Sequence, residues 1–148
     1  MDTVTLERRI EAPPETVFGF LADRVKWLSW MGEDGVFSFA PGGSYRVRLP
    51  GDAVASGDFT AVEPPRRIAF SWGWESGPVA VPPGGSTVEI TLAPAPDGTL
   101  LRLVHSGLPT PEACEAHAES WQHYVDRLAS RAEGADPGPD PWTRQPRG

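Results

Sequence analysis

The stretch that most constrains the fold runs from Ile68 to Trp74 and reads Ile-Ala-Phe-Ser-Trp-Gly-Trp. Successive side chains of a β-strand point to opposite faces, so the four large apolar residues share one face. The small residues Ala69, Ser71 and Gly73 occupy the other face. An apolar face of this size needs to be covered by another element. We therefore expect a sheet that packs one face against a helix.

The same period of two recurs on both sides of this strand. Alternating apolar and polar residues indicate further strands at 44–49, 54–62, 87–92 and 101–105. Within the strand at 54–62, Gly57 is a candidate β-bulge. Turns rich in proline and glycine separate these segments. This punctuation is typical of short antiparallel strands, and we expect six or seven of them in all.

Three helices are expected. The longest begins at Thr110-Pro111-Glu112 and runs to about Arg131, since its apolar residues recur every three or four positions. Two short helices precede the main strands, one beginning at Pro13-Pro14-Glu15 and one at Asp23. The order of strand, two short helices, antiparallel strands and long helix predicts an α+β fold.

Length and composition predict one globular domain of residues 1–132. The chain has 148 residues, and its last stretch, 133–148, is rich in proline and glycine, so we expect a disordered tail there. The single cysteine, Cys114, excludes an intrachain disulfide. A scaffold built on disulfides, as in many small secreted proteins, is therefore excluded as well.

The charge balance excludes several classes of partner. Thirteen basic and twenty acidic residues give a net charge of −7, the wrong sign for binding nucleic acid. No run of eighteen apolar residues is present, and the N-terminus lacks the pattern of a signal peptide. We therefore expect no membrane insertion and a cytoplasmic location.

Taken together, the chain resembles the START-like (SRPBCC) superfamily with the Bet v 1-type helix-grip fold. Within it, the chain is most similar to bacterial proteins related to the activator of the heat-shock protein ninety ATPase. The resemblance covers roughly residues 3–131 and is carried by Ile10–Phe18, Pro41–Tyr45, Val62–Trp72, Ser86–Leu92, Gly98–Leu108, and His117 with Trp121. It implies a curved antiparallel sheet wrapped around the long C-terminal helix, often with a cavity between them.

Such a cavity would be lined by apolar and aromatic residues from the sheet and the helix. The expected ligand-binding residues are Trp30, Tyr45, Val47, Phe70, Trp72, Trp74, Leu103, His105, Trp121, Tyr124 and Val125. Polar contacts would come from His105, Tyr45 and Tyr124. The alternative is that these aromatic rings fill the core and leave no cavity.

Three functions compete at this stage. The leading hypothesis is non-enzymatic binding of a hydrophobic small molecule, similar to a lipid or a polyketide. The second, implied by the resemblance, is a cyclase or dehydratase with His105 as acid or base. The third is a chaperone accessory protein, but the eukaryotic activators carry an additional N-terminal domain, for which 148 residues leave no room. A homodimer is the oligomeric state that we consider besides a monomer.

Established catalytic and cofactor motifs are absent from the sequence. It contains no Gly-x-Ser-x-Gly, phosphate-binding loop, dinucleotide-binding or His-Glu-x-x-His pattern. Cys114 and His117 lie one helical turn apart, but tetrahedral zinc needs two further ligands and only His105 is an evident third. We therefore expect no metal and no cofactor. His123 is expected to face solvent.

Overall fold

The computed structural model describes residues 3–50, 53–76, 81–138, 140 and 141. The elements follow the chain in the order β1 (Val4–Ile10), α1 (Pro14–Gly19), α2 (Arg24–Leu28), β2 (Asp34–Phe37), β3 (Ser44–Leu49), β4 (Ala53–Glu63), β5 (Arg67–Ser76), β6 (Ser86–Ala95), β7 (Gly98–Ser106) and α3 (Pro111–Ala132). The part of the predicted disordered tail that covers 139 and 142–148 lies outside the described residues.

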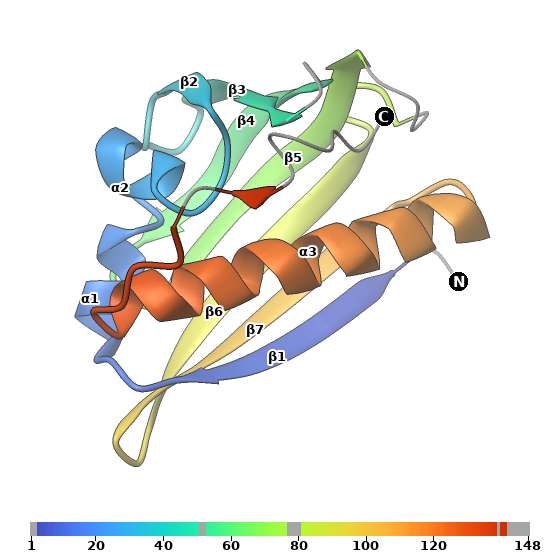
Figure 1. Ribbon diagram of the computed structural model, residues 1–148. Coiled ribbons are helices and arrows are strands. Elements are labelled where there is room, and N and C mark those ends of the chain that lie inside the picture. The colour runs from blue at the N-terminus through green and yellow to red at the C-terminus, as the bar shows by residue number, and fades with distance from the viewer. Residues whose placement is uncertain (1–2, 51–52, 77–80, 139, 142–148) are drawn as a thin grey trace.

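The seven strands form one antiparallel sheet in the order β1-β7-β6-β5-β4-β3-β2. Figure 1 shows the sheet curving around α3, which crosses its concave face, while α1 and α2 lie together at one end. The α+β helix-grip fold expected from the sequence is therefore confirmed. Within this fold, the face of β5 that carries Phe70 and Trp72 is enclosed by the sheet and α3.

The starts of the helices follow from local side-chain chemistry. The Thr110 hydroxyl accepts a hydrogen bond from the Ala113 backbone N–H and thereby caps α3. The Asp23 carboxylate caps α2 in the same way, by accepting from the backbone N–H of Lys26. Proline stands in the first turn of both α1 and α3, where its missing N–H removes no helical hydrogen bond.

Two local features differ from the sequence-based expectation. The sequence pattern does not predict strand β2, because this strand has only four residues and they are at best half-buried. Gly57 is not a bulge: the register of β4 against β5 shifts at Val54/Ala55 and at Phe59/Ala61. A Cβ at Gly57 would stand 2.1 Å from the Ser71 carbonyl oxygen, so glycine permits the close approach of the two strands.

The core lies between the sheet and α3. The inward residues predicted for β3, β6 and β7 are all buried, including Leu103 and His105 with no exposed surface. Beyond α3, the chain turns back on the helix: the Arg127 guanidinium donates to the Gly138 carbonyl, and Arg131 pairs with Asp136. The described part of the predicted tail thus contacts α3 through a hydrogen bond and an ion pair.

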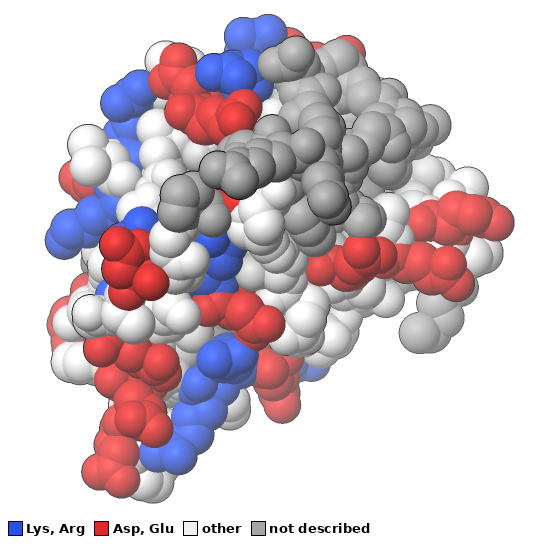
Figure 2. Space-filling model, in the orientation of Figure 1, with Lys and Arg blue, Asp and Glu red and all other residues white. Residues whose placement is uncertain are grey.

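The surface carries both signs of charge in close mixture. Figure 2 shows acidic and basic side chains next to one another on the face that it presents. Ion pairs such as Arg8–Asp126 between β1 and α3, and Arg46–Glu75 between β3 and β5, follow the same pattern. Among the described residues, no helix is long and apolar enough to span a membrane.

Candidate functional site

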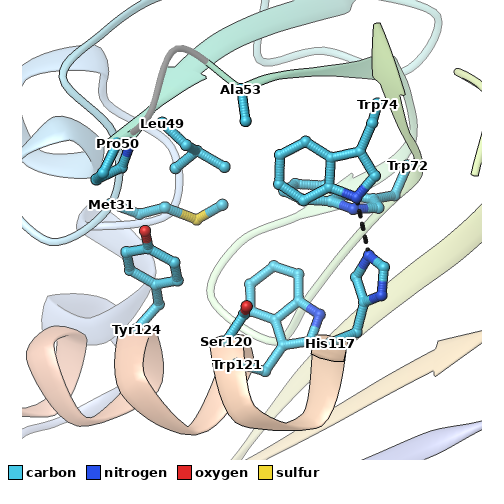
Figure 3. Close-up of a pocket in the computed structure, with 10 residues that line it drawn as sticks. All are labelled: Met31, Leu49, Pro50, Ala53, Trp72, Trp74, His117, Ser120, Trp121 and Tyr124. Atoms are coloured by element: carbon cyan, nitrogen blue, oxygen red, sulfur yellow. Dashed lines mark hydrogen bonds between the residues drawn. The ribbon is translucent and has the colours of Figure 1, made fainter. Parts of the chain in front are cut away.

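A pocket opens where the end of the sheet meets the middle of α3. Strand β5 supplies Trp72 and Trp74 to one wall, and α3 supplies residues one turn apart to the other (Figure 3). The full lining is Met31, Leu49, Pro50, Ala53, Trp72, Trp74, His117, Ser120, Trp121 and Tyr124. None of these side chains is charged, so the wall is apolar with a few hydrogen-bonding groups.

The empty space in this pocket is small. Its volume is about 40 Å³, which is room for a few water molecules. Pockets that enclose a drug-sized ligand span roughly 300–1,000 Å³. The aromatic rings that the sequence analysis assigned to a cavity therefore fill most of the space between β5 and α3, and a small pocket remains there.

One side of the pocket is held by a hydrogen bond between Trp74 and His117. The Trp74 indole Nε1 donates to His117 Nε2 over 3.0 Å, as drawn in Figure 3. An indole nitrogen can only donate, so His117 Nε2 carries no proton. His117 Nδ1 then donates to the Ala113 carbonyl at 2.7 Å. Both ring nitrogens are thus engaged, and His117 is neutral in this arrangement.

A second histidine lies directly behind the first. The Trp121 indole donates to His105 Nδ1 at 3.0 Å, so the proton of the neutral ring resides on Nε2. Nε2 lies 2.7 Å from the Ser86 hydroxyl, which itself donates to the Trp72 carbonyl. The His105 and His117 rings are 4.8 Å apart and perpendicular.

Burial makes both histidines weak bases. Desolvation, together with a smaller electrostatic contribution from the nearby His117, lowers the pKa of His105 to about 3. Desolvation also lowers the pKa of His117, although its hydrogen bond to the Ala113 carbonyl acts in the opposite direction. Neither ring therefore carries a charge near neutral pH.

The structure brings only part of the predicted site to the pocket. Four of the eleven predicted residues line it: Trp72, Trp74, Trp121 and Tyr124. The other seven are buried outside its lining: Trp30, Tyr45, Val47, Phe70, Leu103, His105 and Val125. The Tyr45 hydroxyl donates to the Ser71 carbonyl at 2.6 Å, and burial raises the pKa of Tyr45 well above its usual value.

His105 lacks the surroundings that an acid or base requires. It has no exposed surface, and both of its ring nitrogens face fixed partners within the protein. A substrate atom would have to displace one of these partners to exchange a proton with the ring. The geometry supports a structural role, in which His105 ties β7 to β6 and α3.

Sequence reasoning missed six residues of the pocket: Met31, Leu49, Pro50, Ala53, His117 and Ser120. Leu49 and Ala53 lie at the facing ends of β3 and β4, where the period-two pattern shows only that a side chain points inward. Ser120 precedes Trp121 on α3 and carried no signal of its own. The spacing of residues 117, 120, 121 and 124, at i, i+3, i+4 and i+7, could have identified this face of the helix.

The described residues contain no group of three or more His, Cys, Asp or Glu able to hold a metal ion. The pair weighed from the sequence, Cys114 and His117, does not form such a site, because both nitrogens of His117 are engaged elsewhere. The expectation that His123 faces solvent was wrong. His123 Nε2 lies 2.9 Å from a carboxylate oxygen of Asp140, and its side chain is 18% exposed.

Comparison with solved structures identifies similar proteins of the same fold. An AHSA1-like protein from Rhizobium etli is 48% identical, with a TM-score of 0.75 over 95% of this chain and 87% of that one. CalU16 from Micromonospora echinospora is 29% identical, with a TM-score of 0.77 over 95% and 70%. The Aha1 dimer from Colwellia psychrerythraea is 18% identical, with a TM-score of 0.79 over 93% and 100%.

No curated protein gives a significant sequence match. The family model for "Activator of Hsp90 ATPase homolog 1-like protein" matches residues 11–133, which run from the end of β1 through the whole of α3. These residues include every strand except β1 and every residue of the pocket. The chain therefore belongs to the family of activator of Hsp90 ATPase homolog 1-like proteins.

Proposed function

We propose that the protein binds a small hydrophobic molecule, without chemical turnover, in the pocket between β5 and α3. The observation that carries this proposal is the wall of three tryptophans, Trp72, Trp74 and Trp121, at a pocket that opens into the core. Burial of apolar ligand surface against such rings is favourable by roughly 25 cal/mol per Å². The compartment that we propose is the cytoplasm, on the sequence grounds given above.

The size of the pocket limits the ligand. About 40 Å³ of empty space accepts only a few heavy atoms, so a larger molecule requires movement of the wall. Trp74 and Ser120 are half-buried, whereas Trp72 and Trp121 are each only 2% exposed. We expect the half-buried residues to move, and the buried pair to form the fixed floor.

Enzymatic and chaperone functions have less support. A cyclase or dehydratase would need His105 in contact with substrate, but this ring is enclosed and lies outside the lining of the pocket. The chaperone hypothesis rests on the name of the family alone. A homodimer is a separate proposal, supported by the Colwellia psychrerythraea protein, which is described as a dimer; light scattering during gel filtration tests it.

The binding proposal is tested by filling the pocket from α3. Binding of an uncharged fluorescent probe, N-phenyl-1-naphthylamine, is measured by its fluorescence for the wild type, for Ser120→Phe and for the matched control Ser130→Phe. Ser120 lines the pocket, and Ser130 lies on the same helix outside its lining. We expect loss of probe binding in Ser120→Phe only. Equal probe binding by all three proteins would contradict the proposal.

A further inference from the structure

The six tryptophans of the chain differ in what their indole N–H groups contact. Trp30 donates to the Phe20 carbonyl, Trp74 to His117 and Trp121 to His105. Within the described part of the chain, the buried side-chain polar atoms without a hydrogen-bond partner are Nε1 of Trp27 and Nε1 of Trp72. Buried donors are nearly always paired in folded proteins, so each of these two needs an explanation.

The two unpaired indoles lie in different surroundings. Trp27 packs against the rings of Trp30, Phe37, Phe39 and Phe70 and is 1% exposed. Trp72 is 2% exposed but lines the pocket. Figure 3 shows its indole at the end of the pocket where Trp74 bonds to His117, and the two indole rings are perpendicular with centroids 5.4 Å apart.

We propose that Trp72 Nε1–H is the specificity-determining donor of this pocket and that it binds an acceptor oxygen of an uncharged, largely apolar ligand, such as a ketone. This inference rests on the proposed function of the same pocket. Two histidine acceptors of the same cluster are already engaged. The unprotonated nitrogens His117 Nε2 and His105 Nδ1 already accept hydrogen bonds, from the indoles of Trp74 and Trp121 respectively.

The chemistry of the wall sets the class of ligand. No lining residue is charged, so an ionic ligand would lose its hydration without gaining an opposite charge. A hydrocarbon would leave the Trp72 donor unpaired, whereas a carbonyl oxygen would accept from it. Since the nitrogen has no surface open to the empty pocket, the oxygen reaches it only when side chains of the pocket wall shift.

The test uses two probes of nearly the same shape, acetophenone and α-methylstyrene, which differ in having C=O or C=CH₂. Their dissociation constants are measured by ¹H–¹⁵N NMR titration of the full chain, in which indole N–H groups give separate signals. Wild type should bind acetophenone about three- to tenfold more tightly, the usual contribution of one hydrogen bond. The Trp72 indole signal should move downfield with acetophenone only.

Two variants complete the experiment. Trp72→Phe removes the pocket donor, and the matched control Trp27→Phe removes the other unpaired donor, which lies outside the pocket lining. The ratio of the two affinities cancels changes of pocket size that affect both probes. We expect this ratio to fall below one in Trp72→Phe, since the buried ketone oxygen then has no donor, and to keep its wild-type value in Trp27→Phe.

The outcomes separate this inference from the proposed function. If both probes bind wild type equally, or if the ratio is the same in Trp72→Phe as in wild type, the role of Trp72 is refuted while the pocket stands. If neither probe binds the wild type at millimolar concentration, both the role of Trp72 and the proposed binding of small apolar molecules in this pocket are refuted.

Discussion

Two aromatic clusters of this protein make opposite use of the same residue type. The α2-side cluster consists of Trp27, Phe37, Phe39, Phe59 and Phe70, and these rings contact one another directly at centroid distances of 5.1–6.3 Å. The pocket cluster consists of Trp72, Trp74, Trp121, His105 and His117, in which hydrogen bonds join tryptophan to histidine.

The difference lies in how each cluster is held. Rings in van der Waals contact can shift until they fill the available space. Rings joined by hydrogen bonds have preferred directions, since these bonds weaken steeply as the angle departs from linear. In the pocket cluster, a gap of about 40 Å³ lies beside Trp74 and Trp121. We expect hydrogen bonds within an aromatic core to preserve space that rings in van der Waals contact alone would fill.

The largest effect is expected from removing one tryptophan from each cluster. Trp27→Ala and Trp72→Ala should each lower the free energy of unfolding by about 3–5 kcal/mol, because both rings are almost fully buried. The loss for Trp72→Ala should lie at the lower end of this range, because the side of the Trp72 ring that faces the pocket makes fewer contacts. Denaturant unfolding followed by circular dichroism measures both. A loss of only about 1–2 kcal/mol for Trp72→Ala would show a more open pocket than the structure has.

Acid should act on the pocket cluster, which contains both buried histidines. Their folded-state pKa values lie below the unfolded value of about 6.5, so the unfolded chain binds more protons in this range. The free energy of unfolding should therefore fall as pH drops below about 6.5, by up to about 1.4 kcal/mol per pH unit for each histidine. For His105 this loss continues toward pH about 3.

The pH effect is measured by denaturant unfolding between pH 7.5 and 5.5, above the range in which most carboxylates titrate. The control variant is His117→Gln, whose amide can still accept from Trp74 and does not titrate. The dependence of the unfolding free energy on pH should become weaker in this variant, because the contribution of His117 is removed and that of His105 remains. If the free energy of unfolding depends on pH in this variant as it does in the wild type, His117 does not contribute to the acid effect.

A smaller effect is expected from the hydroxyl that supports His105. Ser86→Ala removes the oxygen that faces His105 Nε2 at 2.7 Å and that donates to the Trp72 carbonyl. The buried N–H of His105 then has no acceptor, which should cost about 1–3 kcal/mol. Ser44→Ala, at an exposed position of β3, should change stability by less than about 0.5 kcal/mol. Equal results for the two variants would contradict the assigned hydrogen-bond chain.

The smallest effect concerns the edge of the pocket. Trp74→Phe keeps an aromatic ring but removes the donor to His117, and Trp74 is only half-buried. We expect a loss of about 0.5–1.5 kcal/mol, the usual net contribution of one hydrogen bond. Thermal unfolding measures the change. A loss above about 3 kcal/mol would mean that Trp74 packs like the α2-side cluster, and that the two regions are less different than described.

The sequence by itself determined the fold and the direction of most side chains. Alternation along β3, β5, β6 and β7 identified the inward residues, because the period of two is a property of the extended backbone. The caps at Thr110 and Asp23 were readable for the same reason, since they depend on contacts within one helical turn. Only short-range regularities were needed for these features.

Only the tertiary structure decided which inward residues line the pocket. His105 and His117 come from β7 and α3, and no local pattern shows that their rings meet at 4.8 Å or which tryptophan donates to each. The sequence also does not reveal that Trp72 Nε1 has no hydrogen-bond partner, because this depends on the positions of all the elements around it. The extended backbone fixes which side chains of a strand point inward. Whether these side chains fill the core or leave a pocket depends on how they pack with side chains from distant segments.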